Sequence, residues 1–327
     1  MYKTQIKRLI NLRSVHVNPN IGFNPNIATT TNAVSNNNTS FSTLEQSHFA
    51  KLAPTWWDPS GNQRILHLMN SKRIEFIRAT LTKKFSESAN KNKTEDTIYI
   101  PKFNKDLLPN SVRLQVDTMQ QTYLDELLTE NVKNWKVLDM GCGGGLLTES
   151  LSRLSMFENV KGYDITEECI QVAKAHAEND MQLKENLADG TLSYEIKDLF
   201  NDPDHTTKFN MICCFEMLEH VDEPFKVLDC LKDKLETDGV LVLSTINKEL
   251  VSYLTTILAA EHVLGLVPKG THDFNKYINC EDIENWGFKN KMELIDAKGV
   301  MFNPIKDEWE LHDKKDVGNY FISFRKL

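Results

Sequence analysis

The central part of the chain alternates short apolar runs with amphipathic stretches, and this alternation restricts the fold more than any other feature. The apolar runs are WKVLDMG, VKGYDI, LSYEIKD, FNMICC and GVLVLSTIN. The segments between them include LLTESLSRLS, TEECIQVAKAHAEN and PFKVLDCLKDKL, which have helical spacing. The pattern predicts an α/β fold, in which helices cover both faces of a parallel sheet and ligands bind at the carboxyl ends of its strands. Near the end, MELIDAKGVMFNP and VGNYFISFRKL are typical of two strands joined by a polar turn, which suits an antiparallel edge.

Charge is distributed unevenly along the 327 residues. The net charge is −8, although residues 1–44 hold four basic residues and no Asp or Glu, so that residues 45–327 carry −12. We expect no nucleic-acid partner for so acidic a body, because Lys and Arg on phosphate supply most of that affinity. The six cysteines form no CxxC pair, which argues against a zinc knuckle or a secreted disulfide scaffold and favours a reducing compartment.

The first 44 residues differ in composition from the rest. A basic start, MYKTQIKRLINLRS, is followed by the polar, low-complexity segment NPNIATTTNAVSNNNTSFST. Acid-poor leaders that contain Arg and Ser resemble organelle transit peptides, most often mitochondrial ones. The alternative is a disordered Asn-rich tail. In either case we exclude residues 1–44 from the fold and predict one domain over 45–327, with a polar insertion at about 83–111.

A glycine-rich loop follows the first strand of the alternating series. LDMGCGGGLLTES places glycines at 141, 143, 144 and 145, where they allow a tight turn and a close approach of backbone to ligand. Leu146 stands where a dinucleotide fingerprint needs a further glycine, and no G-K-[ST] follows, so the loop is neither an NAD loop nor a triphosphate loop. Asp164 ends the second strand and is placed to accept hydrogen bonds from both hydroxyls of a ribose. A nucleoside ligand without a diphosphate fits the combination of this glycine loop and Asp164 best.

Three residues that bind protons or metals follow the FNMICC strand. In FEMLEH, Glu216, Glu219 and His220 are spaced i, i+3 and i+4, so a helical turn would present them on one face. Two carboxylates and an imidazole suit Mg²⁺, whereas His220 alone suits a general base. A structural turn is the third alternative.

The glycine loop and Asp164 resemble those of class I S-adenosylmethionine-dependent methyltransferases. The segments CCFEMLEHVDEPFKVL, APTWWDPSGNQRILHLMNSKRIEFI and LVPKGTHDFNKYI resemble more specifically the O-methyltransferases of ubiquinone biosynthesis, over about residues 47–327 apart from the insertion. The resemblance implies a Rossmann-like sheet of seven strands, mostly parallel with an antiparallel edge strand, an N-terminal helical segment and an apolar insertion after strand 5. It also implies S-adenosylmethionine and, with it, a substrate: a catechol that bears a polyprenyl chain.

The resemblance assigns S-adenosylmethionine contacts to Arg73, Gly141, Asp164 and Phe215. Arg73 offers a guanidinium to the methionyl carboxylate. Its alternative is an ordinary solvated helix residue. Phe215 departs from the family, whose residue varies here, and matters little if that contact is made by backbone. The metal ligands carried over are Glu216, Glu219 and His220.

The apolar stretch LVSYLTTILAAEHVLGLV, at 250–267, belongs to a flap expected at about 250–275. It is too short and too interrupted to cross a bilayer, and its periodicity suits a core helix equally well. A lipid-tailed substrate favours contact with the matrix side of the mitochondrial inner membrane, as a peripheral protein in a complex with other ubiquinone-biosynthesis proteins. The competing functions are a catalytically silent methyltransferase-like scaffold and a methyltransferase of a small soluble catechol.

Overall fold

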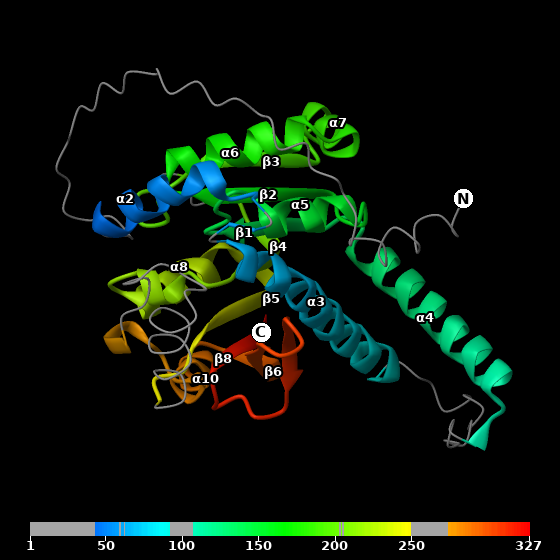
Figure 1. Cartoon of the computed structure of the whole chain (residues 1–327). Helices are drawn as coiled ribbons and strands as arrows, with labels where there is room; N and C mark the ends of the chain where they lie inside the picture. Colours follow the sequence, from blue (N-terminus) through cyan, green and yellow to red (C-terminus); the bar gives the residue numbers. More distant parts are fainter. Residues whose placement is uncertain are drawn as a thin grey trace. The chain divides into compact units, whose positions relative to one another are not determined.

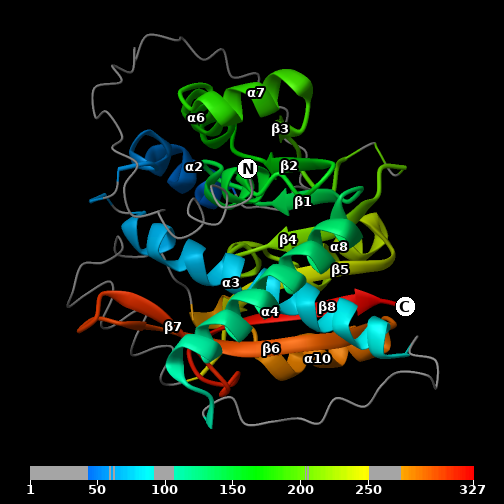
Figure 2. The same cartoon turned by 90° about the vertical axis from the view of Figure 1, so that its right-hand side faces the viewer.

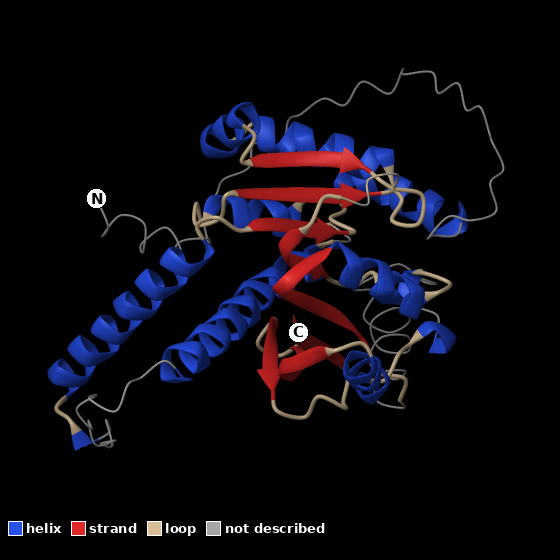
Figure 3. Cartoon of the chain, turned by 180° about the vertical axis from the view of Figure 1, so that it is seen from behind, coloured by secondary structure: helices blue, strands red, loops and turns tan. Residues whose placement is uncertain are grey.

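The computed structural model describes residues 43–58, 60–61, 63–91, 107–202, 204, 206–249 and 274–327. Their strands form one mixed sheet in the order β3-β2-β1-β4-β5-β8-β6-β7 (Figures 1 and 3). The predicted α/β fold is confirmed. Three segments named above lie outside the described residues: leader residues 1–42, residues 92–106 of the polar insertion, and residues 250–273 of the apolar flap.

The parallel part of the sheet places the site. It consists of β1 (Lys136–Met140), β2 (Asn159–Asp164), β3 (Leu192–Ile196), β4 (Phe209–Cys214) and β5 (Leu235–Ile246). Each neighbouring pair runs parallel. The chain moves outward from β1 through β2 to β3 and then returns to β4 on the other side of β1. Ligands bind at such a reversal of strand order, so the loops after β1 and β4 meet at the expected place.

The antiparallel part contains one more strand than expected. It is formed by β6 (Met292–Asn303), β7 (Glu308–His312) and β8 (Asn319–Lys326), and β8 runs antiparallel to both β5 and β6. The described sheet therefore has eight strands, and the expectation of seven was wrong. The segment read as a polar turn contains β7, in which Trp309 is buried and packs with Phe302 of β6. Alternation of Trp309 and Leu311 with glutamates is the period of a half-buried strand.

Helices cover both faces of the sheet. On one face, α3 (Arg64–Lys91), α4 (Asn110–Val132) and α5 (Leu146–Arg153) contribute to a cluster with the strand residues Val137, Met211 and Val242. On the other, α8 (Pro224–Lys234) and α10 (Cys280–Lys289) pack on Leu138, Ile212 and Leu243. Neighbouring residues of β1 and of β4 thus face opposite layers, as the pleat requires. In addition, α6 (Glu167–Glu178) and α7 (Met181–Asp189) cover β3.

The N-terminal helical segment is confirmed. It begins with α2 (Thr43–Leu52) and the 3-10 turn η1 (Ala53–Thr55), which lead to α3. Figure 2 shows α3 and α4 in front of the central strands. Met69, Phe76 and Ile77 place the buried stripe of α3 against the sheet. Among the described residues, no helix is both long enough and apolar enough to cross a bilayer.

Candidate active site

The glycine loop turns tightly at the end of β1. Gly141, Gly143 and Gly145 have positive φ angles of 75°, 53° and 88°, which side chains disfavour. The N–H groups of Gly141 and Cys142 donate to the carbonyl of Tyr163 at 2.8 and 3.0 Å, so the loop is tied to the end of β2. It therefore lies beside Asp164.

Asp164 is held by backbone donors. Its two carboxylate oxygens accept hydrogen bonds of 2.8 Å from the N–H groups of Gly143 and Thr166. Burial raises the pKa of Asp164, and these backbone hydrogen bonds oppose the rise. Each carboxylate oxygen has a further lone pair, so the fixed group is able to accept hydrogen bonds from ribose hydroxyls.

Arg73 is buried in the same pocket. Only 6% of the residue is exposed, so the solvated-helix alternative was wrong. Its guanidinium lies 5.3 Å from the centre of the Phe215 ring, and its Nε has no hydrogen-bond partner among the described residues. Burial lowers the pKa of Arg73, against the opposing charges of Glu216, Asp139 and Glu219. A buried guanidinium whose Nε has no partner among the described residues suits an anionic ligand group such as a methionyl carboxylate.

A pocket brings most of the predicted residues together. Its lining residues surround about 700 Å³ of space, open solvent at the mouth included. The predicted residues that line it are Arg73, Gly141, Asp164, Phe215, Glu216 and His220. Glu219 does not line it. Asp139, Phe49 and Trp56 do, although sequence reasoning did not single them out.

The two glutamates of FEMLEH are held by the end of β5. Glu216 has a positive φ of 52°, and its N–H donates to Ser244 Oγ at 2.8 Å, while that hydroxyl donates back to Glu216 Oε1 at 2.6 Å. Thr245 Oγ1 donates to Glu219 Oε2 at 2.9 Å. Burial, and then the charge of Glu216, raise the pKa of Glu219 to about 7. The adjacent hydroxyls in LSTIN were the available sequence signal for these contacts.

His220 is bound to a residue that the sequence did not single out. Its Nδ1 lies 3.2 Å from Oε2 of Glu45 on α2, and Lys276 lies 3.5 Å from the other oxygen of Glu45. Burial alone would lower the pKa of His220, but the hydrogen bond with Glu45 and the charges of Glu219, Glu45 and Glu216 outweigh it, so that the pKa is raised. Glu45 is remote in sequence, and only the docking of α2 reveals its role.

The expected single helical face is not present. Only Leu218–His220 form a 3-10 turn, η3, and the left-handed backbone at Glu216 turns its carboxylate toward β5. Within the ranges that the structure describes, no three His, Cys, Asp or Glu side chains lie close enough to hold a metal ion. The donor set nevertheless contains the buried Glu219 and the half-buried Glu216, whose charge adds to burial in raising the pKa of Glu219, and a divalent cation relieves such repulsion. Metal binding therefore stays a prediction.

Comparisons with known proteins identify the family of the chain. The family profile described as a methyltransferase domain matches residues 113–293. The chain is 42% identical over 294 residues to a mitochondrial ubiquinone biosynthesis O-methyltransferase of Candida albicans, covering 88% of this chain and 86% of that one. The chain belongs to the ubiquinone biosynthesis O-methyltransferase family.

Further relatives of this family come from yeast and bacteria. The mitochondrial ubiquinone biosynthesis O-methyltransferase of Saccharomyces cerevisiae is 43% identical over 291 residues, 86% of this chain and 87% of the relative. The ubiquinone biosynthesis O-methyltransferase of Actinobacillus pleuropneumoniae is 32% identical over 284 residues, which cover 86% of this chain and 97% of the relative. Membership makes the chain an S-adenosylmethionine-dependent O-methyltransferase with a role in ubiquinone biosynthesis, and the names of the fungal relatives support a mitochondrial location.

Proposed function

We propose that the chain methylates one hydroxyl of a polyprenylated catechol, of the 3,4-dihydroxy-5-polyprenylbenzoate and demethylubiquinol types. The observation that carries the proposal is one pocket lined by a ribose acceptor, a buried guanidinium and His220, whose Nδ1 is held by Glu45 from outside the pocket. Bound S-adenosylmethionine supplies an electrophilic methyl group. Asp164 binds its ribose, the glycine loop at Gly141 lies along its methionyl part, Arg73 binds its carboxylate, and Phe215 packs beneath Arg73.

His220 is the proposed proton acceptor. Glu45 occupies Nδ1 and orients the ring, so Nε2 is the nitrogen that takes the proton of the catechol hydroxyl. The oxygen then bonds to the methyl carbon as the carbon–sulfur bond breaks, and S-adenosylhomocysteine leaves. The nearby carboxylates of Glu219 and Glu45 stabilise the imidazolium that results.

We also propose Mg²⁺ as a second factor, with Glu216, Glu219 and His220 as its protein ligands. When bound, Mg²⁺ supplies positive charge that stabilises the catecholate. Direct ligation by His220 competes with its role as a base, because a nitrogen that binds metal does not take a proton. The two assignments therefore predict different responses to a chelator.

The location and the partners are proposed from the chemistry of the substrate. A polyprenyl chain resides in the bilayer, so we infer a peripheral enzyme on the matrix side of the mitochondrial inner membrane, associated with other ubiquinone-biosynthesis proteins. Residues 1–44 would direct its import. A fluorescent reporter fused to these residues should enter mitochondria, and a diffuse cytosolic signal would rule the leader out.

The decisive experiment is a methyl-transfer assay on prenylated and unprenylated catechols, with and without EDTA. Turnover of the prenylated substrate supports the proposed function, preference for the unprenylated one supports a soluble catechol enzyme, and binding of S-adenosylmethionine without any turnover supports a silent scaffold. If EDTA abolishes turnover and Mg²⁺ restores it, the metal proposal stands. If EDTA has no effect while His220→Ala is inactive, the metal-free base stands.

A further inference from the structure

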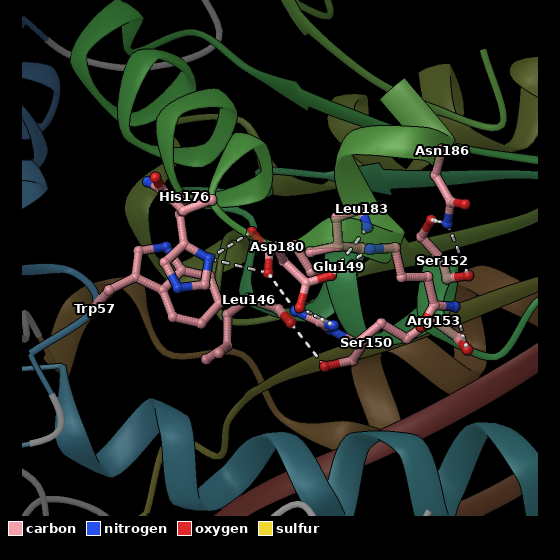
Figure 4. A network of polar contacts seen from close by, with 12 residues as sticks. Trp57, Leu146, Glu149, Ser150, Ser152, Arg153, His176, Asp180, Leu183 and Asn186 are labelled. Carbon is pink, nitrogen blue, oxygen red and sulfur yellow. Dashed lines mark hydrogen bonds and ion pairs between the residues drawn. The ribbon is translucent and has the colours of Figure 1, made fainter. Parts of the chain in front are cut away.

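Two adjacent tryptophans, Trp56 and Trp57, cover the glycine loop from outside the sheet. The indole N–H of Trp57 donates to the carbonyl of Gly144 at 2.9 Å. Its ring stacks in parallel on His176, with ring centres 3.5 Å apart (Figure 4). A third aromatic ring, His67, meets Trp57 edge-on at 5.3 Å. Trp57 is therefore fixed against the loop on several sides.

His176 is itself held in place. Its Nδ1 lies 2.8 Å from Oε1 of the buried Glu149, which also lies 3.7 Å from Arg153 (Figure 4). Arg153 in turn pairs with Asp180, the N-cap residue of α7, at 2.8 Å. None of these four residues lines the pocket. They form a support that runs from α5, α6 and α7 to Trp57, the residue next to Trp56 in the chain.

Trp56 forms part of the pocket wall. Its ring lies directly on the loop: a Cβ added at Gly143 would come within 2.2 Å of it, and one at Gly144 within 2.4 Å. Unlike its neighbours, Gly144 has no positive φ, so the close approach of Trp56, and not the turn, is what requires glycine at this position. His67 Nε2 lies 2.8 Å from the backbone carbonyl of Trp56 and fixes the main chain there.

The indole nitrogen of Trp56 has no partner. The residue is only 6% exposed, and its Nε1 is buried without a hydrogen bond to any described residue. Buried polar groups are normally satisfied, and an exception at a pocket points to a ligand. Arg73 Nε is a second unpartnered donor among residues lining the same pocket. S-adenosylmethionine offers acceptors for both, in its carboxylate and its ribose oxygens.

We propose that Trp56 is a further S-adenosylmethionine-binding residue, whose indole N–H donates a hydrogen bond to the bound methyl donor, and that Trp57, His176 and Glu149 position it. This inference rests on the proposed function. It goes beyond the contacts expected from the sequence, because it adds a donor from the N-terminal segment and explains why Gly144, the third glycine of the loop, is a glycine.

The test compares Trp56→Phe with the wild-type chain by calorimetry with S-adenosylmethionine. Phenylalanine keeps an aromatic ring on the loop but removes the N–H, so the dissociation constant should rise about tenfold, or ~1.4 kcal/mol. Thermal stability without ligand should fall modestly, because the smaller ring leaves part of the buried Trp56 site unfilled, and thermal unfolding checks that the variant is folded. Trp286→Phe is the matched control: that indole N–H donates to Asp229 at 3.0 Å, far from the pocket, so stability should fall and affinity should not change.

Two further readouts separate binding from support. Ligand-induced quenching of tryptophan fluorescence should be lost in Trp56→Phe and kept in Trp286→Phe. Gly144→Ala should weaken binding in the wild-type background but add little to Trp56→Ala, because the clash that it creates is with Trp56. In Trp57→Ala, KM for S-adenosylmethionine should rise more than kcat falls.

The outcomes distinguish the inference from the function on which it rests. If the wild-type chain does not bind S-adenosylmethionine, the proposed function fails. If the wild type binds and Trp56→Phe binds equally well with the same quenching, the function stands and the role of Trp56 is overturned.

Discussion

At the scale of single residues, the buried guanidinium of Arg73 gives the sharpest expectation. Arg73→Met should weaken S-adenosylmethionine binding by roughly 10- to 150-fold, since hydrogen bonds to charged groups contribute about 1.5–3 kcal/mol. Calorimetry with S-adenosylmethionine measures the loss of affinity, and thermal unfolding without ligand checks that the substituted chain is folded.

Arg78→Met on the same helix is the control for Arg73. Arg78 pairs with Asp125 of α4 away from the pocket, so its loss should leave the affinity unchanged. Equal affinities in Arg73→Met and the wild type would exclude Arg73 from the cofactor site.

Asp139 gives a prediction with a definite pH dependence. Burial raises its pKa to about 6, although the hydroxyl of Thr148 donates to it at 2.6 Å. This pKa exceeds the value of 3.8 in the unfolded chain, so between pH 4 and 6 the folded state binds more protons than the unfolded state. The contribution of Asp139 to the free energy of unfolding therefore increases as the pH falls. Above pH 6 the buried carboxylate is charged and lowers the free energy of unfolding by on the order of 3 kcal/mol.

Asp139→Asn should therefore be more stable than the wild type at pH 7.5, and the difference should shrink as the pH falls to 5. Urea unfolding of both proteins at pH 7.5 and at pH 5 measures this difference in the free energy of unfolding. Because all other titrating groups are shared, a difference that does not vary with pH would show that Asp139 does not titrate in this way.

The residues that the sequence predicted are those whose neighbours are close in the chain or whose loop position is fixed by a strand end. Asp164 and Gly141 end β2 and β1, and Arg73 carries a family resemblance. Glu45 and Trp56 reach the site only through the docking of α2 and η1, which no local pattern encodes. Burial, which sets the state of Arg73, is likewise a property of the folded chain.

At the scale of elements, the parallel half was predictable because each strand is a short apolar run between helices. The strand β7 was missed although Trp309 and Leu311 alternate with polar residues, because EWELH is short and mostly polar and becomes a strand by pairing with the long β6. The turn after β4 was read as helical from spacing alone. Ser244 at the end of β5 instead fixes Glu216 in a left-handed conformation, and that contact is made across strands.

The contribution of α2 to catalysis is testable through Glu45. Glu45→Gln keeps the size of the side chain but removes the charge that supports His220, so kcat should fall by roughly 10- to 100-fold. Affinity for S-adenosylmethionine should change little, because Glu45 is not among the pocket-lining residues. Glu130→Gln, at a surface pair with Lys133, should have wild-type kcat. An unchanged kcat in Glu45→Gln would make the α2 contact purely structural.

At the scale of the whole molecule, charge restricts how the enzyme meets a membrane. Residues 45–327 carry −12, which repels anionic lipid. Attachment must then come from apolar contact, for which the sequence offers the stretch 250–267, or from partner proteins.

We predict that residues 45–327 bind lipid vesicles, as measured by flotation, to the same extent in about 0.05 and 0.5 M salt. Roughly tenfold more salt shortens the electrostatic screening length about threefold but leaves apolar burial intact. Raising the anionic lipid fraction should weaken binding at low salt. Removing residues 250–267 should abolish it, provided that circular dichroism shows the shortened chain to be folded. Binding that needs anionic lipid and is lost in salt would mean that a local basic surface, and not an apolar segment, carries the enzyme to its lipid-tailed substrate.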